Sequence, residues 1–314
     1  MLGDLMLDEY IFGEVNRISP EAPIPILDVK DITHTPGGAA NAVHNVLSLG
    51  GKVIAVGVIG PDEKGEMLKK ILKEKGVEVE GLIVDDQRKT TLKTRVVARN
   101  QQVVRIDAES REPISPQTEE KIISFIKNHI GGLNAIIISD YAKGVITPTL
   151  SQKIIALARE NNVFCLVDPK GKDYSKYKNC HLITPNLTEL SQALSIPMEQ
   201  LESESRFLQA GKMLLAHVLS DNALVKRHDK GMSLFEKNGN TFSCPALNKK
   251  AVDVSGAGDT AVGTLALAIA AGADLKQAVI LASHACAIKV GKLGTAVVSA
   301  KELEESVRNN LVNE

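Results

Sequence analysis

Short apolar runs alternate with amphipathic stretches along most of this chain. The apolar runs predict strands at residues 53–59, 135–139, 163–167, 182–184 and 223–225. The amphipathic stretches predict helices at residues 38–50, 62–75, 116–129, 149–160, 203–219, 261–271 and 275–290, and a polar terminal helix to residue 313. Strands that alternate with helices are typical of an α/β fold with a mostly parallel central sheet. Ligands of such sheets bind beyond the carboxyl ends of the strands.

Two regions break this rhythm. Residues 24–33 and 90–107 alternate apolar and polar positions with no helix between the runs, which predicts an antiparallel appendage beside the main sheet. We interpret the appendage as a lid over the edge where ligands gather. The same pattern also allows two extra strands on the main sheet.

Composition narrows the class of protein. With 314 residues, 44% hydrophobic content and 24 glycines, the chain can bury a sizeable core. A formal charge of −1 argues against nucleic acid or an anionic membrane as a partner, although a small anionic substrate stays possible. The four cysteines form no C-x-x-C pair, the seven histidines form no H-x-x-x-H pair, and there is no signal peptide or membrane-length apolar run. We therefore expect a cytoplasmic protein with reduced thiols and no metal cage.

The segment with the most chemical content is D-V-S-G-A-G-D-T, residues 253–260, which opens a long apolar helix. Gly256, Ala257 and Gly258 would bring backbone N–H groups close to an anion at the helix N-terminus. Asp259 would then be placed to accept a proton from an attacking hydroxyl, as phosphoryl transfer requires. The alternative is a glycine-rich turn whose Asp caps a core helix.

Other motifs identify the type of kinase. The chain has no G-x-x-x-x-G-K-[ST], H-R-D or D-F-G segment, which excludes P-loop enzymes and protein kinases. Residues 253–260 resemble the C-terminal signature of the ribokinase-like (PfkB) carbohydrate kinases, and G-G-A-A-N at 37–41 resembles their glycine pair and sugar-binding Asn. The resemblance covers the whole chain. It implies one ribokinase-like kinase domain over residues 1–314, a three-layer α/β fold with a small β-sheet lid formed by residues 10–35 and 89–108.

Within this family, further motifs narrow the expected substrate. They lie at residues 19–23, 99–105, 139–144, 168–171, 184–189 and 291–295. They resemble motifs of kinases that use ATP to phosphorylate the anomeric hydroxyl of D-glycero-β-D-manno-heptose 7-phosphate, giving the 1,7-bisphosphate for ADP-heptose and the lipopolysaccharide core. Such kinases are sometimes fused to an adenylyltransferase, which we do not expect here. The alternatives are a kinase for fructose 1-phosphate or tagatose 6-phosphate, or a non-catalytic nucleotide- or sugar-binding regulator.

The acceptor side of the site is expected to use short polar side chains and cations. Candidates for the sugar hydroxyls are Asp8, Gly37, Gly38 and Asn41. A substrate phosphate calls for fixed cations, because neutral groups alone bind a dianion poorly. Together with Asp140, the candidates are Lys93, Arg95, Arg99, Arg105, Lys143 and Lys170. Lys143 is the strongest of these, because it follows the apolar strand at 135–139; exposed lid cations have solvation as their alternative role.

The nucleotide side rests on the resemblance. The N-x-x-E element comprises Asn186, Leu187, Thr188 and Glu189. It implies Mg²⁺ held near Glu189 largely through water, although the same residues also form a helix capping box. Arg227, Gly231 and Ser255 are expected near the ATP phosphates, and Asp253 near a monovalent cation such as K⁺. Because the chain has no tryptophan, we expect the adenine on aliphatic surface near residues 282–289.

Two expectations concern the chain as a whole. Residues 1–4 begin where the family has usually completed its first buried strand, so the resemblance implies a central strand that is partly missing and a ladder short of partners. The exposed strand edges of the lid predict a homodimer through the lid. The resemblance implies the same, because proteins of this family commonly dimerise there.

Overall fold

The computed structural model describes residues 1–99, 101–248, 251–292, 294 and 296–311. The strands are β1 Leu2–Gly3, β2 Leu5–Ile18, β3 Pro25–Gly38, β4 Ile54–Ile59, β5 Glu78–Val84, β6 Thr91–Ala98, β7 Gln101–Ala108, β8 Ala135–Ser139, β9 Phe164–Asp168, β10 Leu182–Ile183, β11 Asn222–Lys226, β12 Met232–Glu236 and β13 Thr241–Cys244. The α-helices are α1 Ala39–Ser48, α2 Glu63–Glu74, α3 Pro116–His129, α4 Pro148–Glu160, α5 Leu187–Leu194, α6 Glu204–Val218, α7 Ala257–Ala270, α8 Leu275–Lys289 and α9 Ala300–Leu311.

Nine strands form the main sheet in the order β13-β12-β11-β10-β9-β8-β1-β4-β5. The pairings from β5 to β11 are parallel, and β12 and β13 add an antiparallel edge. The connections between the parallel strands mostly contain helices, as the alternating sequence pattern predicts. The mostly parallel α/β sheet is therefore confirmed.

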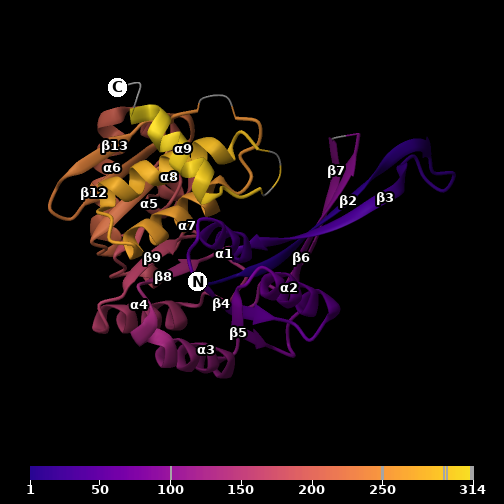
Figure 1. Ribbon diagram of the computed structural model, residues 1–314, viewed down its shortest axis with the longest axis horizontal. Helices are drawn as coiled ribbons and strands as arrows, with labels where there is room; N and C mark the ends of the chain where they lie inside the picture. Colours follow the sequence, from indigo (N-terminus) through magenta and orange to yellow (C-terminus); the bar gives the residue numbers. More distant parts are fainter. Residues whose placement is uncertain (100, 249–250, 293, 295, 312–314) are drawn as a thin grey trace.

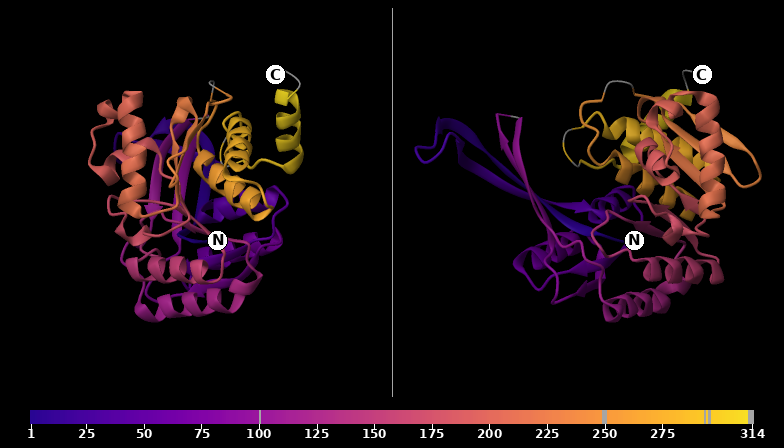
Figure 2. Two further views of the ribbon diagram at one scale, coloured as in Figure 1. Left: turned by 90° about the vertical axis from the view of Figure 1, so that its left-hand side faces the viewer. Right: turned by 180° about the vertical axis from the view of Figure 1, so that it is seen from behind.

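Helices cover both faces of this sheet (Figures 1 and 2). One face buries Ile122 of α3, Ile154 of α4 and Phe207 of α6 against the strands. The opposite face buries α7 and α8 in one cluster, and α1 with α2 in another. The resulting three layers bring the amino end of α7 to the edge of the sheet where the parallel strands end. Among the described helices, none is long and apolar enough to cross a membrane.

The lid is a second sheet of four strands in the order β3-β2-β6-β7, and it projects from the body as a long blade (Figure 1). The strands β2 and β3 pair antiparallel, as do β6 and β7. We predicted an antiparallel appendage, but β2 and β6 pair parallel, so the lid is a mixed sheet. The reason is that β2 and β6 enter the lid from the same end, at Met6 and Thr91.

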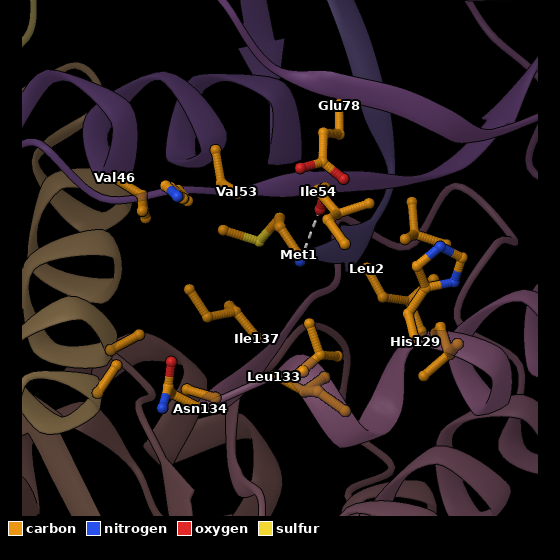
Figure 3. A pocket seen from close by; sticks show the side chains of 18 of the residues that line it. Met1, Leu2, Val46, Val53, Ile54, Glu78, His129, Leu133, Asn134 and Ile137 are labelled. Atoms are coloured by element: carbon orange, nitrogen blue, oxygen red, sulfur yellow. Dashed lines mark hydrogen bonds between the residues drawn. The ribbon is translucent and has the colours of Figure 1, made fainter.

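The shortest ladder of the main sheet lies between β1 and β4. The strand β1 has two residues, and its Leu2 pairs with Val56 of β4 and Ile138 of β8. Beside it lies a cavity of about 500 Å³ lined mainly by apolar side chains of β4, β8 and α7. The Met1 amino group lies at this cavity and donates to the Ile54 carbonyl at 3.0 Å (Figure 3).

Candidate active site

The N-terminus of α7 has the backbone features of an anion-binding site. Gly256, the residue before the helix, has φ of +78°, a conformation that favours glycine. Among the described residues, no side chain caps this end of the helix. The first N–H groups of α7 therefore point outward without side-chain partners, in the positive field of the helix dipole. Among them, the Ala257 N–H donates to the Val254 carbonyl at 3.2 Å. An anion site at Gly256, Ala257 and Gly258 stays a prediction.

Asp259 lies in the first turn of α7 and is 8% exposed. Its Oδ2 accepts a hydrogen bond of 2.6 Å from Nδ2 of Asn41, and its Oδ1 accepts one from the Tyr141 hydroxyl. Burial raises the pKa of Asp259 to about 6, against the opposing effect of these two donors. A carboxylate with such a pKa is mostly ionised at neutral pH and is basic enough to take a proton.

Asn41 joins the acceptor side to Asp259. It lies in α1, and its buried Oδ1 has no hydrogen-bond partner among the described residues. Thr260 donates to Asn45 at 2.8 Å, which ties α7 to α1 one turn further along. An unpaired buried acceptor next to a base is suited to a substrate hydroxyl.

The glycine pair lets Asp8 reach the same region. A Cβ on Gly37 would lie 2.7 Å from the Asp8 carboxylate, and Gly38 has φ of +54° at the start of α1. Asp8 is buried and binds Nη1 of Arg95 at 2.7 Å. The structure thus brings together four residues predicted for the acceptor side, namely Asp8, Gly37, Gly38 and Arg95.

The carboxylate of Asp4 holds the loop after β8, a role that the sequence analysis did not predict. The Asp4 carboxylate accepts backbone N–H groups from Tyr141 at 2.7 Å, Lys143 at 3.2 Å and Val145 at 3.2 Å. Burial first and the charge of Asp140 second raise the pKa of Asp4 to about 6. No motif marks Asp4, because its role depends on contacts with residues more than 130 positions away.

Asp140 supports this loop from its own side. Its carboxylate accepts hydrogen bonds from the Ala142 N–H at 2.6 Å, from Lys176 at 2.5 Å and from the Tyr177 hydroxyl at 2.6 Å. These contacts use both oxygens of the Asp140 carboxylate. The structure therefore favours a bracing role over the substrate contact that we predicted.

Two of the predicted cations meet at one carboxylate. Lys143 lies 2.7 Å and Lys93 lies 3.6 Å from Oε2 of Glu109, and Lys93 also contacts Asp107 at 3.2 Å. Glu109 was not predicted, because no motif in the sequence marks it. We call Lys93, Lys143 and Glu109 the ammonium cluster. A substrate phosphate could replace Glu109 as the partner of both ammonium groups.

The other predicted cations pair with groups other than Glu109. Arg105 is half exposed and forms an ion pair with Asp107 at 2.9 Å, so it shares this carboxylate with Lys93. Arg99 follows the end of β6, where its guanidinium contacts Asn16 at 3.5 Å. Lys170 binds Glu189 at 2.8 Å, so it belongs with the N-x-x-E element instead of the ammonium cluster.

The N-x-x-E element forms the start of α5. Asn186 is the N-cap and exchanges hydrogen bonds of 2.9 Å with Glu189, so the predicted capping box is present. Leu187 and Thr188 form the first turn between them. One carboxylate oxygen of Glu189 is used in the cap and the other binds Lys170, so direct metal coordination would have to displace one of these contacts.

Lys226 and Arg227 follow each other at the end of β11, but they point to different places. Arg227 binds Glu204 at 2.6 Å and lies over the ring of Phe207. Lys226 instead binds Asp168 at 2.7 Å, beside Gly258. The geometry therefore favours Lys226 over the predicted Arg227 as the cation next to the nucleotide.

A pocket of about 510 Å³ opens beside the N-terminus of α7. Its lining includes Lys226, Asn186 and Gly258. Apolar side chains also line it, among them Val290 and Ala287, and Ala287 belongs to the aliphatic surface predicted for an adenine near residues 282–289. Gly231 also lines the pocket and has φ of +83°, with no room for a Cβ beside the Cys244 carbonyl.

Asp253 and Ser255 hold the loop before α7. Asp253 accepts the Ser255 N–H at 2.8 Å with one oxygen and the Gly294 N–H at 2.9 Å with the other. The nearby Lys289, which is 1% exposed, donates to the Gly294 carbonyl at 2.9 Å. A monovalent cation would meet a carboxylate already used by the backbone and an ammonium group close by, so this site fits potassium poorly.

Within the described ranges, no three or more His, Cys, Asp and Glu side chains gather to hold a metal ion. Magnesium prefers phosphate and water oxygens with one or two carboxylates. The site fits such an ion only if the nucleotide phosphates supply most of its ligands, with Glu189 as the nearby carboxylate.

Comparison with known proteins agrees with this geometry. The sequence matches the pfkB family carbohydrate kinases over residues 4–302. It is 46% identical to the bifunctional protein HldE of Geobacter metallireducens over 96% of this chain and 61% of that protein. It is 41% identical to the bifunctional protein HldE of Helicobacter pylori over 96% of this chain and 65% of that protein. The chain thus spans less than two thirds of the length of these relatives.

Solved structures share the fold. Phosphofructokinase-2 of Escherichia coli in complex with potassium gives a TM-score of 0.80 at 20% identity, over 98% of both chains. Ribokinase of Arabidopsis thaliana complexed with ribose and ATP gives 0.76 at 18% identity, over 98% of this chain and 97% of that one. The likeness to these structures supports the fold alone, whereas the family match covers most of the sequence. The chain belongs to the pfkB family of carbohydrate kinases.

Proposed function

We propose that this chain uses ATP to phosphorylate the anomeric hydroxyl of D-glycero-β-D-manno-heptose 7-phosphate, giving the 1,7-bisphosphate for ADP-heptose and lipopolysaccharide core synthesis in the cytoplasm. The observation that carries the proposal is the loop from Tyr141 to Lys143. At one end of this loop Tyr141 contacts Asp259, and at the other Lys143 joins the ammonium cluster. A substrate with a hydroxyl at one end and a phosphate at the other matches this arrangement.

The proposed reaction uses few groups. Asn41 and Tyr141 hold the Asp259 carboxylate. Asp259 accepts the proton of the sugar hydroxyl while the hydroxyl oxygen attacks the γ-phosphorus of ATP. The uncapped N–H groups at the start of α7 stabilise the negative charge on the phosphoryl group. The lid would exclude water and so limit hydrolysis of ATP.

The pocket beside α7 is the proposed ATP site. Its apolar lining suits an adenine, and Lys226 and Gly258 of the same lining would contact the phosphates. Glu189 would hold a magnesium ion through water, and the ion would neutralise phosphate charge. We assign no step to potassium, because the surroundings of Asp253 fit it poorly.

Turnover on a panel of sugars tests the proposal. ATP consumption with Mg²⁺ is measured on both anomers of the heptose 7-phosphate, fructose 1-phosphate, fructose 6-phosphate, tagatose 6-phosphate and ribose. Turnover confined to the β-heptose phosphate is the expected result. Preferred turnover on another phosphosugar would overturn the substrate but keep the kinase, and failure on every sugar with ATP binding intact would favour a regulator.

The lid also supports a proposed homodimer. It exposes large apolar side chains, among them Ile18, Val29, Ile32 and Ile106 on its strands and Ile24 between β2 and β3. A second copy would cover such a surface. Light scattering should give twice the chain mass. Ile32→Glu should produce monomer, whereas Leu219→Glu, at an exposed position after α6, should not; a monomeric wild type would contradict the proposal.

A further inference from the structure

Lys226 is a partly buried ammonium group at the edge where the parallel strands end. It is the last residue of β11, and its backbone N–H donates to the Pro185 carbonyl at 2.9 Å. Its side chain is 16% exposed, and Nζ donates to Oδ1 of Asp168 at 2.7 Å. The strand and the ion pair together fix the position of the charge.

This charge lies against the first turn of α7. A Cβ on Gly258 would be 3.7 Å from Nζ of Lys226. The N–H groups of that turn have no side-chain cap among the described residues, and Lys226 and Gly258 both line the proposed ATP pocket. A fixed ammonium and a helix N-terminus therefore face the same space from two elements, a combination that suits a phosphoryl anion.

Carboxylates surround this space. Burial lowers the pKa of Lys226, but the charges of Asp168, Glu189 and Asp259 outweigh it, so the pKa lies above its ordinary value and the group stays protonated. Asp168 and Asp259 would repel an incoming phosphate. A cation between them and the phosphate removes this repulsion.

We propose that Lys226 is a catalytic residue that binds the phosphoryl group during its transfer. The inference rests on the proposed kinase function. In the reaction the sugar oxygen forms a bond to the γ-phosphorus, and the bond from that phosphorus to the β–γ bridging oxygen breaks. The nucleoside diphosphate leaves with the electron pair, and the hydroxyl proton goes to Asp259. Lys226 gains and loses no proton; it holds the negative charge in place.

A purely structural role is the competing explanation. In that case Lys226 only neutralises Asp168, and its removal would act by leaving a buried carboxylate unpaired. The two explanations differ when both partners are removed. A Lys226→Met and Asp168→Asn double variant has no unpaired charge. If Lys226 were purely structural, this variant would therefore regain both stability and kcat.

The experiment compares Lys226→Met, Lys226→Arg and the double variant with wild type. We expect Lys226→Met to lower kcat by about 10²- to 10³-fold. It should also weaken the binding of a non-hydrolysable ATP analogue more than the binding of ADP, as measured by calorimetry, because only the triphosphate carries the γ-phosphoryl group. Lys226→Arg should recover part of the loss, and the double variant should regain thermal stability without regaining kcat.

A matched control tests the loss of an ion pair by itself. Asp221 lies just before the amino end of β11 and binds Arg159 at 2.7 Å, so Arg159→Met removes an ion pair of the same length, although more exposed, away from the pocket. Its kcat should stay within about twofold of wild type. Recovery of kcat in the double variant, or equal loss of ATP analogue and ADP binding in Lys226→Met, would overturn the inference. Absence of wild-type turnover on every sugar would instead count against the proposed function, and the calorimetric comparison would still decide on Lys226.

Discussion

The Tyr141 hydroxyl donates a hydrogen bond to Asp259, 118 positions away in the chain. Burial and the charge of Asp259 raise the pKa of Tyr141 well above its ordinary value, so the phenol remains a donor. A donor to a carboxylate stabilises its ionised form and lowers its pKa. Tyr141 therefore limits how far burial raises the pKa of Asp259, which also faces the charges of Asp168 and Lys226.

Tyr141→Phe should shift the pH profile of kcat/KM. Activity should fall as pH drops and Asp259 becomes protonated, with a wild-type midpoint near the pKa of about 6. Loss of a hydrogen bond to a charged group is worth roughly 1.5–3 kcal/mol, so the midpoint should rise by about one to two pH units. The rate measured from pH 5 to 9 checks this.

Tyr174→Phe is the control for that profile. Tyr174 is fully buried, and its hydroxyl has no partner among the described residues. This variant should keep the wild-type midpoint. If Tyr141→Phe lowers the rate equally at every pH, then Tyr141 does not tune the base.

Asp259→Asn should lose turnover and gain stability. Loss of the base should lower kcat by about 10²- to 10⁴-fold. The folded-state pKa of about 6 lies above the ordinary 3.8, so the folded protein binds this proton more tightly and loses stability as pH rises through 6. The variant should be more stable than wild type at pH 8 by on the order of 2–3 kcal/mol.

Thermal unfolding at pH 5 and pH 8 measures that difference. The stability gain should shrink at pH 5, where wild-type Asp259 is mostly protonated in the folded state. A gain of the same size at both pH values would show that packing, and not the buried charge, is its cause. Retained turnover would contradict the role of Asp259 as base.

The fold was largely predictable because its elements carry local signals. Helix α3 lies at the predicted residues, since Ser115 caps it and Pro116 starts it. The strand β5 was missed because its residues 78–84 mix acidic, apolar and glycine positions without a clear period. The parallel pairing of β2 with β6 was missed because register between distant strands leaves no local pattern.

The site was predictable only where a motif exists. Asp259, Asn41 and Lys143 belong to recognisable segments, whereas Asp4 and Glu109 act through partners far away in the chain. Lys226 ends β11 and Arg227 follows it, and their side chains bind different carboxylates, Asp168 and Glu204. The sequence could not tell which of the two would lie next to the nucleotide, because both are cations at the same strand end.

Lys143→Met should weaken binding of the phosphorylated sugar. Lys143 contributes one ammonium of the cluster, and a charge-assisted hydrogen bond is worth roughly 1.5–3 kcal/mol. KM for the phosphosugar should therefore rise by about 10- to 100-fold, with KM for ATP nearly unchanged. Steady-state kinetics with each substrate varied in turn measures both constants.

Arg111→Gln is the control for the cluster. Arg111 also binds Glu109, at 2.8 Å, but its side chain is 73% exposed, so its removal should leave KM within about twofold. A similar rise in KM for both substrates of Lys143→Met would contradict a role in binding the sugar phosphate.

Gly37→Ala should damage the acceptor side through a single methyl group. The new Cβ would lie 2.7 Å from the Asp8 carboxylate, closer than real contacts allow, so Asp8 or the backbone must shift. Overpacking of this kind costs about 1–3 kcal/mol of stability, and movement of Asp8 away from Arg95 should also raise KM for the sugar. Gly131→Ala is the matched control, because a Cβ there meets nothing within 4 Å. Thermal unfolding and sugar KM are compared for the two variants, and equal behaviour would show that Gly37 is not needed to make room for Asp8.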